Sequence, residues 1–310
     1  MSEQPKILIA GGTGFVGTHL VKPLAADHDV VVLSRSGKAP EGARGMTWNS
    51  EPGPWAQELE GAKAVINLVG ETIAQRWTED AKERILESRL KSTRSIGEAI
   101  ASASQPPTVW VNASAVGIYG DTGPREVTEA SPPGTGFTAE VGEAWEAAVN
   151  EPELPSTRRV ICRLGTVLGK DGGALPRLAK LANFGLGGAL GHGEQFVSWI
   201  HIDDLVSMIR WSIEHDDIHG VLNATAPNPV TNSMLMSELR AVYGRPPVPK
   251  LPAAVFKIVA NVVGVPAELL LTGQRAVPAI PLGRGFLFQH DKIRGALQNL
   301  LADHPTAWKK

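Results

Sequence analysis

The chain has 310 residues, of which 43% are hydrophobic and 20% are charged, a composition that is typical of soluble globular proteins and excludes a disordered chain. Thirty Lys and Arg residues against 32 Asp and Glu residues give a net charge of −2, so charge gives no reason to expect nucleic acid or a membrane as a partner. The single cysteine, Cys162, has no partner for an internal disulfide, which favours a reducing, cytoplasmic location. No apolar stretch approaches the roughly 20 residues that a membrane helix needs.

Short apolar runs recur along the first half of the chain, with helical patterns between them. The runs are apolar on both faces, like the strands of a parallel sheet that helices cover on both sides. They lie at residues 6–10, 30–33, 64–68, 109–113 and 160–164. The clearest helical patterns lie at residues 78–103, where Thr78 is the expected N-cap, and 138–149. This alternation predicts an α/β fold with a Rossmann-type, doubly wound parallel sheet.

The second half of the chain has a different residue pattern. A glycine-rich stretch at residues 185–193 is followed by an apolar run at 196–202 and by a helix whose expected N-cap is Asp203 or Asp204. Residues 221–224 have the pattern of a further strand. A proline-rich connection then leads to a smaller, mostly helical C-terminal portion.

The strongest motif is a glycine turn between the first predicted strand and the first predicted helix. In this context the pattern is typical of dinucleotide-binding folds: Gly11 allows the tight turn, Gly14 a close approach to a pyrophosphate, and Gly17 close packing of the helix on the sheet. The helix N-terminus offers N–H groups to the phosphates, and Pro23 lies downstream of that first turn. The alternative is a plain tight turn. The cofactor-binding residues expected here are Gly11, Thr13, Gly14, Phe15, Val16 and Gly17.

The end of the second predicted strand indicates which dinucleotide is bound. A site for NAD usually has an acidic residue about 20 residues after the glycine turn. Here the strand ends in Ser34-Arg35-Ser36, with Lys38 close by and no carboxylate. An arginine attracts a 2′-phosphate, so the sequence predicts NADP(H) over NAD(H), with an exposed cationic turn as the alternative.

These motifs place the expected cofactor site in the first part of the chain. We expect an NADP-binding Rossmann domain over residues 1–165, joined by returning segments at about 195–225. Residues 166–310 are expected to form a substrate-side and C-terminal domain. A monomer and a homodimer are both compatible with the sequence.

The chain also resembles the extended short-chain dehydrogenase/reductases. The resemblance is carried by the glycine turn, by Asn67–Gly70 and by the Ser114–Gly120 segment. A narrower match is to an atypical, epimerase-like subgroup with a C-terminal domain of unknown function, marked by Ser88-Arg89 and by residues 199–204 among others. The resemblance implies a Rossmann fold that binds NADP(H). The further cofactor-binding residues that it implies are Asn67, Leu68, Val69, Gly70, Ser114 and Gly165.

One departure from the family pattern bears on the reaction. Extended reductases have a Tyr-x-x-x-Lys pair in which the tyrosine exchanges a proton and the lysine lowers the pKa of that tyrosine. The corresponding positions here are Phe137 and Val141. A phenyl ring cannot exchange a proton and an isopropyl group cannot stabilise a phenolate, so the usual chemistry is unsupported. The resemblance to the subgroup includes this loss.

Other side chains could still take part in catalysis or binding. Ser114 and Tyr119 are the catalytic candidates, with a turn residue and a packed ring as the respective alternatives. Glu71 and Arg76 are substrate-side candidates, and the arginine could bind a carboxylate or phosphate of the substrate. The alternative is a salt-bridge set with Lys82 and Arg89 that fixes the loop to its helix, or, for Lys82 and Arg89, an ordinary charge on the helix face. His201 is a further substrate-side candidate, for which packing or anchoring of a loop is the favoured alternative. No Cys/His cluster has metal-ligand spacing, so no metal is predicted.

Two functions therefore remain open from sequence. The first is an NADP(H)-dependent, epimerase-like oxidoreductase that acts on a small-molecule substrate, with an anionic group as one option. The second is a non-catalytic NADP(H)-binding protein that senses redox state. An NAD-linked sugar-nucleotide epimerase is disfavoured by Arg35, Phe137 and Val141.

Overall fold

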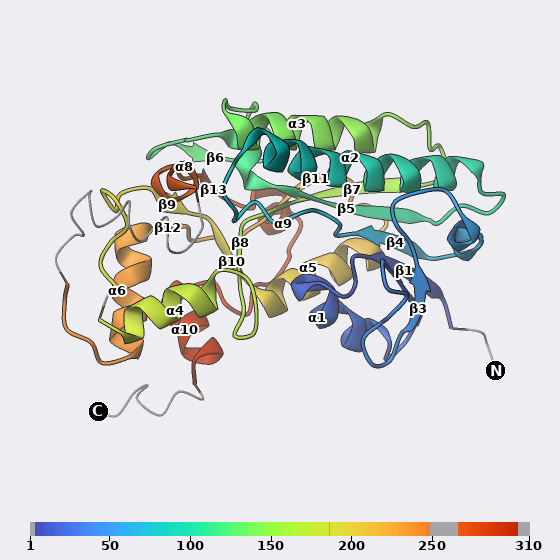
Figure 1. The fold of residues 1–310 in the computed structure, drawn as a ribbon. Helices are drawn as coiled ribbons and strands as arrows, with labels where there is room; N and C mark the ends of the chain where they lie inside the picture. The colour runs from blue at the N-terminus through green and yellow to red at the C-terminus, as the bar shows by residue number, and fades with distance from the viewer. Residues whose placement is uncertain (1–3, 186, 249–265, 303–310) are drawn as a thin grey trace.

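A seven-stranded parallel sheet forms the centre of the computed structural model, which describes residues 4–185, 187–248 and 266–302. The strand order is β11-β7-β5-β4-β1-β2-β3, and helices lie on both faces of the sheet (Figure 1). The predicted Rossmann-type sheet is confirmed. The strands are β1 (Lys6–Ala10), β2 (Asp29–Ser34), β3 (Arg44–Thr47), β4 (Ala64–Asn67), β5 (Val109–Ala115), β7 (Arg158–Leu164) and β11 (Gly220–Ala224).

Alternate residues of each central strand face different helix layers. In β1, Ile7 and Ile9 belong to the core cluster that includes Leu20 of α1 (Phe15–Leu24) and Ile209 of α5 (Ile202–Glu214). Leu8 belongs to the opposite cluster, on the face covered by α2 (Glu79–Ser102) and α3 (Phe137–Asn150) in Figure 1. Burial on both faces explains why these strands are continuous apolar runs. Cys162 of β7 is part of the first cluster and is 1% exposed.

The N-cap predicted for α2 is confirmed, whereas the N-caps predicted for α5 are not. The side chain of Thr78 accepts a hydrogen bond from the Ala81 N–H at 3.2 Å, so the predicted N-cap of α2 is confirmed. The predicted caps of α5 are wrong: the cap is His201, whose Nδ1 accepts from the Asp203 N–H at 3.1 Å. The Asp204 carboxylate instead accepts the N–H groups of Gln289 and His290, at 2.8 and 3.0 Å.

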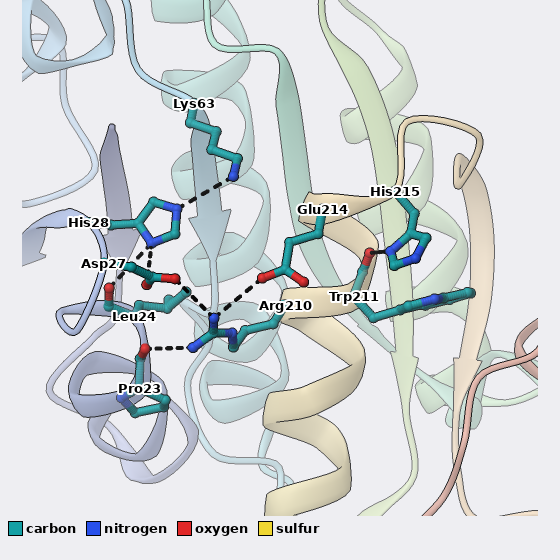
Figure 2. Close-up of polar contacts among 9 residues, drawn as sticks. All are labelled: Pro23, Leu24, Asp27, His28, Lys63, Arg210, Trp211, Glu214 and His215. Carbon is teal, nitrogen blue, oxygen red and sulfur yellow. Dashed lines mark hydrogen bonds and ion pairs between the residues drawn. The ribbon is translucent and has the colours of Figure 1, made fainter. Parts of the chain in front are cut away.

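The C-terminal end of α1 is fastened to α5 by a set of polar contacts (Figure 2). Arg210 donates from Nη1 to the carbonyl oxygen of Pro23 at 2.6 Å and from Nη2 to Asp27 at 3.1 Å and Glu214 at 3.3 Å. His28 contacts the other carboxylate oxygen of Asp27 at 2.7 Å. These contacts secure the end of α1 opposite to its first turn, where Pro23 interrupts the backbone hydrogen bonding.

Beyond the main sheet, the chain forms short strand pairs and helices that extend one end of the sheet (Figure 1). The described part of the C-terminal portion is smaller and largely helical, as predicted, whereas residues 249–252 of the predicted proline-rich connection lie outside the described residues. Within the described ranges, no helix is long and apolar enough to span a membrane.

The short strand pairs beyond the main sheet are β6 (Glu126–Val127) with β13 (Arg275–Ala276), β8 (Thr166–Leu168) with β10 (Trp199–His201), and β9 (Phe196–Val197) with β12 (Val230–Thr231). The helices are α4 (Leu175–Asn183), α6 (Asn232–Val242), α8 (Ala267–Leu271), α9 (Ala279–Gly283) and α10 (Ile293–Leu300), with 3₁₀ turns at Pro54–Leu59 and Val116–Tyr119.

Candidate functional site

The glycine turn forms a tight connection between β1 and α1. Gly11 has a φ of +78°, a conformation that favours glycine, and its N–H donates to the Leu33 carbonyl at 3.1 Å. Gly14 is the N-cap of α1, with no capping side chain and no acidic residue in the first turn. Within the described residues, the N–H groups of residues 15–17 therefore have no hydrogen-bond partner. Such a helix start can bind a phosphate group.

Two of these glycines are constrained in different ways. The sequence predicted that Gly17 allows the helix to pack closely on the sheet. A Cβ at Gly17 would lie 2.5 Å from Cα of Gly12, so at this position the helix packs on the backbone of the glycine turn instead. A Cβ at Gly14 would meet only the Gly11 carbonyl oxygen, at 3.3 Å. The fold thus requires glycine at position 17, while position 14 is left open toward the outside of the turn.

The loop after β4 lies beside the glycine turn, because a Cβ at Gly11 would come within 3.2 Å of the Leu68 backbone. Asn67 is buried, and its side-chain amide donates to Asn112 at 2.8 Å and to Thr93 at 3.2 Å. Its Oδ1 accepts the Val69 N–H at 3.1 Å. The Asn67 side chain therefore fixes this loop, and cofactor contacts by residues 67–70 stay a prediction.

Arg35 follows the last residue of β2 and is exposed to solvent. The Ser34 hydroxyl donates to the Lys38 carbonyl at 2.7 Å and so holds the turn that carries Arg35 and Ser36. Across the described ranges, the Arg35 guanidinium has no hydrogen bond or ion pair. It is free to bind an anion at the edge of the sheet that also carries the glycine turn.

A cavity of about 300 Å³ lies at the carboxyl ends of β5 and β7. Its walls include Ala115–Gly117 after β5 and Leu164–Thr166 after β7. Phe137 and Val141, at the positions of the family tyrosine and lysine, also line it. The positions at which the family has its tyrosine and lysine therefore line this cavity, and in this chain they carry apolar side chains.

Aromatic rings and one cation shape this cavity. Trp77 packs against Phe137 with ring centroids 4.8 Å apart, and both rings line the space. Arg89 lines it as well, and its guanidinium lies over the Trp145 ring at 4.9 Å. From sequence, Arg89 is either a member of the charged set with Glu71 and Arg76 or an ordinary charge on the helix face; the structure places it partly buried in the cavity wall.

Ser114 and Tyr119 belong to a buried network next to the cavity rather than to its described lining. The Ser114 hydroxyl donates to Glu146 at 2.7 Å, and Glu146 forms a bidentate ion pair with Arg163 through two contacts of 2.7 Å. Arg163 donates to the Tyr119 hydroxyl at 2.8 Å, and that hydroxyl donates to Asn223 at 2.7 Å. Burial raises the pKa of Tyr119. Both hydroxyls predicted for catalysis are therefore engaged by the protein.

Sequence reasoning missed the central pair of this network. Arg163 lies in the apolar run of β7, and Glu146 follows Trp145 on the buried stripe of α3. A charged residue inside such a run must be paired when it is buried. The interruption of two apolar patterns by opposite charges is the signal that could have identified the pair.

The three substrate-side candidates lie apart. Glu71 accepts from Gln75 at 2.9 Å and from Arg84 at 3.3 Å, and the hydrogen bond from Gln75 and then the pair with Arg84 lower its pKa. Arg76 is exposed and does not line the cavity among the described residues. His201 is 1% exposed at the start of α5.

His201 lies in the one group of possible metal ligands within the described ranges, together with Asp203 and His290. Its Nδ1 accepts the Asp203 N–H, and its Nε2 lies 3.2 Å from Oδ1 of Asn299. Because Nδ1 is an acceptor, Nε2 carries the proton and donates to Asn299. The ring also stacks on His290, with centroids 3.8 Å apart. Nδ1 thus caps α5, while Nε2 and the stacked ring hold α5 against the C-terminal segment.

The sequence model of the NAD dependent epimerase/dehydratase family matches residues 7–224, which include the glycine turn and the cavity loops after β5 and β7. The chain belongs to this family. A domain of unknown function, DUF1731, matches residues 251–300 of this epimerase/dehydratase family member, which in part lie outside the described ranges. The predicted combination of an epimerase-like chain and such a C-terminal domain is confirmed.

Relatives of this family member match over nearly the whole chain. Human epimerase family protein SDR39U1 is 36% identical over 302 residues, which cover 96% of this chain and 100% of the relative. Epimerase family protein YfhF of Bacillus subtilis is 37% identical, covering 97% of this chain and 99% of the relative. The crystal structure of human SDR39U1 (isoform 2) with NADPH has a TM-score of 0.85, at 36% identity and with 96% and 99% of the two chains covered. A nucleoside-diphosphate sugar epimerase from Corynebacterium glutamicum has a TM-score of 0.78 at 32% identity, covering 97% of this chain and 58% of that protein.

Proposed function

We propose that this protein is an NADP(H)-binding, epimerase-like oxidoreductase that acts on a small molecule. The observation that carries the proposal is the uncapped first turn of α1 with exposed Arg35 at the end of the neighbouring strand β2. The free N–H groups suit the pyrophosphate and the guanidinium suits the 2′-phosphate of NADP(H). The solved complex of the human relative with NADPH supports this choice of cofactor.

The cavity is the proposed reaction site. In open α/β sheets, ligands bind at the carboxyl ends of the strands, so the strand order would place this cavity within reach of a dinucleotide held at β1 and β2. NADPH, when bound, would supply the hydride for a reduction. Thr138 and Thr166 line the cavity, and no hydrogen bond of their hydroxyls is found within the described residues, so we assign these two residues to orienting the substrate oxygen. Ser114 and Tyr119 remain catalytic candidates that would first have to leave their buried hydrogen bonds.

The cofactor assignment is tested by titrating the protein with NADPH and NADH and following cofactor fluorescence. We expect wild type to bind NADPH more tightly than NADH. Arg35→Ala should weaken NADPH binding by about 10- to 100-fold, the loss of roughly 1.5–3 kcal/mol from a charge-assisted contact, and leave NADH binding unchanged. The matched control is Lys22→Ala, which removes an exposed cation from the last turn of α1. Tighter binding of NADH by wild type would refute the assignment.

A second function is favoured by a different observation. Phe137 and Val141 replace the catalytic pair, and the hydroxyls of Ser114 and Tyr119 are engaged in buried hydrogen bonds. These facts suit a protein that binds NADP(H) and reports redox state without turnover. Screening NADPH oxidation against aldehydes, ketones and sugar nucleotides separates the two functions. Turnover of any of these classes supports the oxidoreductase, whereas tight NADPH binding without turnover supports the sensor.

A further inference from the structure

Arg89 is held in one orientation in the wall of the cavity. Its guanidinium lies over the Trp145 ring, 4.9 Å from the ring centroid, and next to Gly70, where a Cβ would come within 3.1 Å of the Arg89 Cζ. Nη1 donates to two backbone carbonyls, that of Glu71 at 3.0 Å and that of Ile85 at 2.8 Å. The ring contact, the close Gly70 and the two hydrogen bonds from Nη1 together restrict the orientation of the guanidinium.

The remaining edge of this guanidinium has no partner. Within the described residues, Nε and Nη2 of Arg89 make no hydrogen bond. This is the edge that binds a carboxylate through two parallel hydrogen bonds. Other arginines of the chain use this edge in that way: Arg163 binds Glu146 through Nε and Nη2, and Arg294 binds Glu238 through the same two atoms at 2.8 and 2.9 Å.

The charges around the cavity leave the Arg89 cation without a paired carboxylate. The Glu71 side chain is directed to Gln75 and Arg84, and Glu268, the one carboxylate among the described lining residues, is exposed to solvent. Burial lowers the pKa of Arg89 to about 10, which leaves it charged at neutral pH. A partly desolvated cation of this kind gains most from an anion supplied by a ligand.

We propose that the cavity binds a compact carboxylate, with Arg89 as the residue that determines this specificity through its Nε and Nη2 atoms. The packed rings of Trp77 and Phe137 provide an apolar wall for the body of the ligand. A volume of about 300 Å³ is enough to hold a small acid. The inference rests on the proposed function only in assigning the substrate class, a carboxylate that also bears a carbonyl or hydroxyl group.

The test uses the full-length protein and two fluorinated probes of nearly equal shape, 4-fluorobenzoate and its neutral analogue 4-fluorobenzamide. Their binding is followed by ¹⁹F NMR with and without NADP⁺. We expect wild type to prefer the benzoate by at least about tenfold, because charge-assisted bidentate hydrogen bonds are stronger than neutral ones. Arg89→Gln should abolish this preference, and Arg89→Lys, which keeps the charge but loses the planar fork, should reduce it.

The matched control is Arg94→Gln, which removes an exposed arginine from the same helix, where it pairs with exposed Glu151. It should retain the preference of wild type. Equal binding of the two probes by wild type, no binding of the benzoate, or a preference that persists in a folded Arg89→Gln or Arg89→Lys protein would each overturn the inference. NADPH titration of the same samples tests the proposed function separately: normal NADPH binding without carboxylate preference refutes only the inference, and the reverse refutes only the cofactor assignment.

Discussion

Glu146 and Arg163 form a buried bidentate ion pair that also receives the hydroxyl of Ser114 and supports the hydroxyl of Tyr119. All three guanidinium nitrogens of Arg163 and both carboxylate oxygens of Glu146 have a hydrogen-bond partner, which is the condition under which a buried ion pair is tolerated. At the scale of single residues, the network therefore holds the ends of β5 and β7 next to the cavity. Removal of this network should therefore lower the free energy of unfolding more than it changes any reaction in the cavity.

Glu146→Ala provides the corresponding prediction. The substitution leaves the Arg163 guanidinium buried without its carboxylate, so the free energy of unfolding should fall by about 3–5 kcal/mol. Chemical denaturation followed by far-UV circular dichroism measures the change. Glu151→Ala, which breaks an exposed pair with Arg94, should cost no more than about 1 kcal/mol. Equal losses in the two variants would show that the buried network is not a stabilising unit.

The element that the sequence predicts best is the strand–turn–helix unit of β1, the glycine turn and α1. In this unit Gly17 is required by the fold and Gly14 is not, because their added methyl groups would meet different amounts of backbone. The same pattern of glycines thus combines a packing requirement with a proposed binding requirement. A pair of alanine variants can separate the two.

Gly17→Ala should destabilise the protein by about 1–3 kcal/mol or more, since its methyl group would lie 2.5 Å from the Gly12 backbone. Gly14→Ala should keep a melting temperature close to that of wild type while weakening NADPH binding, because its methyl group points to where the proposed pyrophosphate approaches. Differential scanning fluorimetry and NADPH titration of both variants measure the two effects. The assignment fails if Gly14→Ala binds NADPH as wild type does.

These elements could be predicted because they depend on local sequence patterns. Features that depend on contacts between distant parts of the chain could not. The Thr78 cap and the glycine turn depend on residues a few positions apart, so the sequence shows them directly. The orientation of Arg89 depends on Gly70 and Trp145, which come from a loop and a different helix. Strand β3 was not predicted because its residues are mostly exposed at the edge of the sheet and show no apolar run.

At the scale of the whole molecule, the start of α5 is one of the places where the chain around the central sheet contacts the C-terminal segment. Asp204 accepts hydrogen bonds from the backbone of Gln289 and His290, while His201 stacks on His290 and donates to Asn299 of α10. These contacts join parts of the chain that are more than 80 residues apart in sequence. We expect the buried imidazole of His201 to make this junction sensitive to acid.

The pH dependence of stability follows from the direction of the His201 pKa shift. Burial, and then the neighbouring His290, lower the pKa of His201 below its usual value of 6.5, an effect that Asp203 and Asp204 partly oppose. Between the two pKa values the unfolded chain binds more protons than the native protein, so this contribution to stability is complete above about pH 6.5 and is lost as the pH falls through the native pKa.

Melting temperatures between pH 7.5 and 5 should therefore fall more steeply for wild type than for His201→Asn. His215→Asn, at an exposed histidine after the end of α5, should retain the slope of wild type. A wild-type slope in His201→Asn would assign the acid sensitivity to other groups.

The lone thiol at Cys162 has a practical consequence. It lies in β7 between β5 and β11, and burial raises the pKa of its sulfur to about 12. Because the thiolate is the nucleophile and almost none is present at neutral pH, an alkylating reagent must wait until the strands separate. The rate of alkylation consequently reports how often the centre of the molecule opens, at one defined position and without any engineered label.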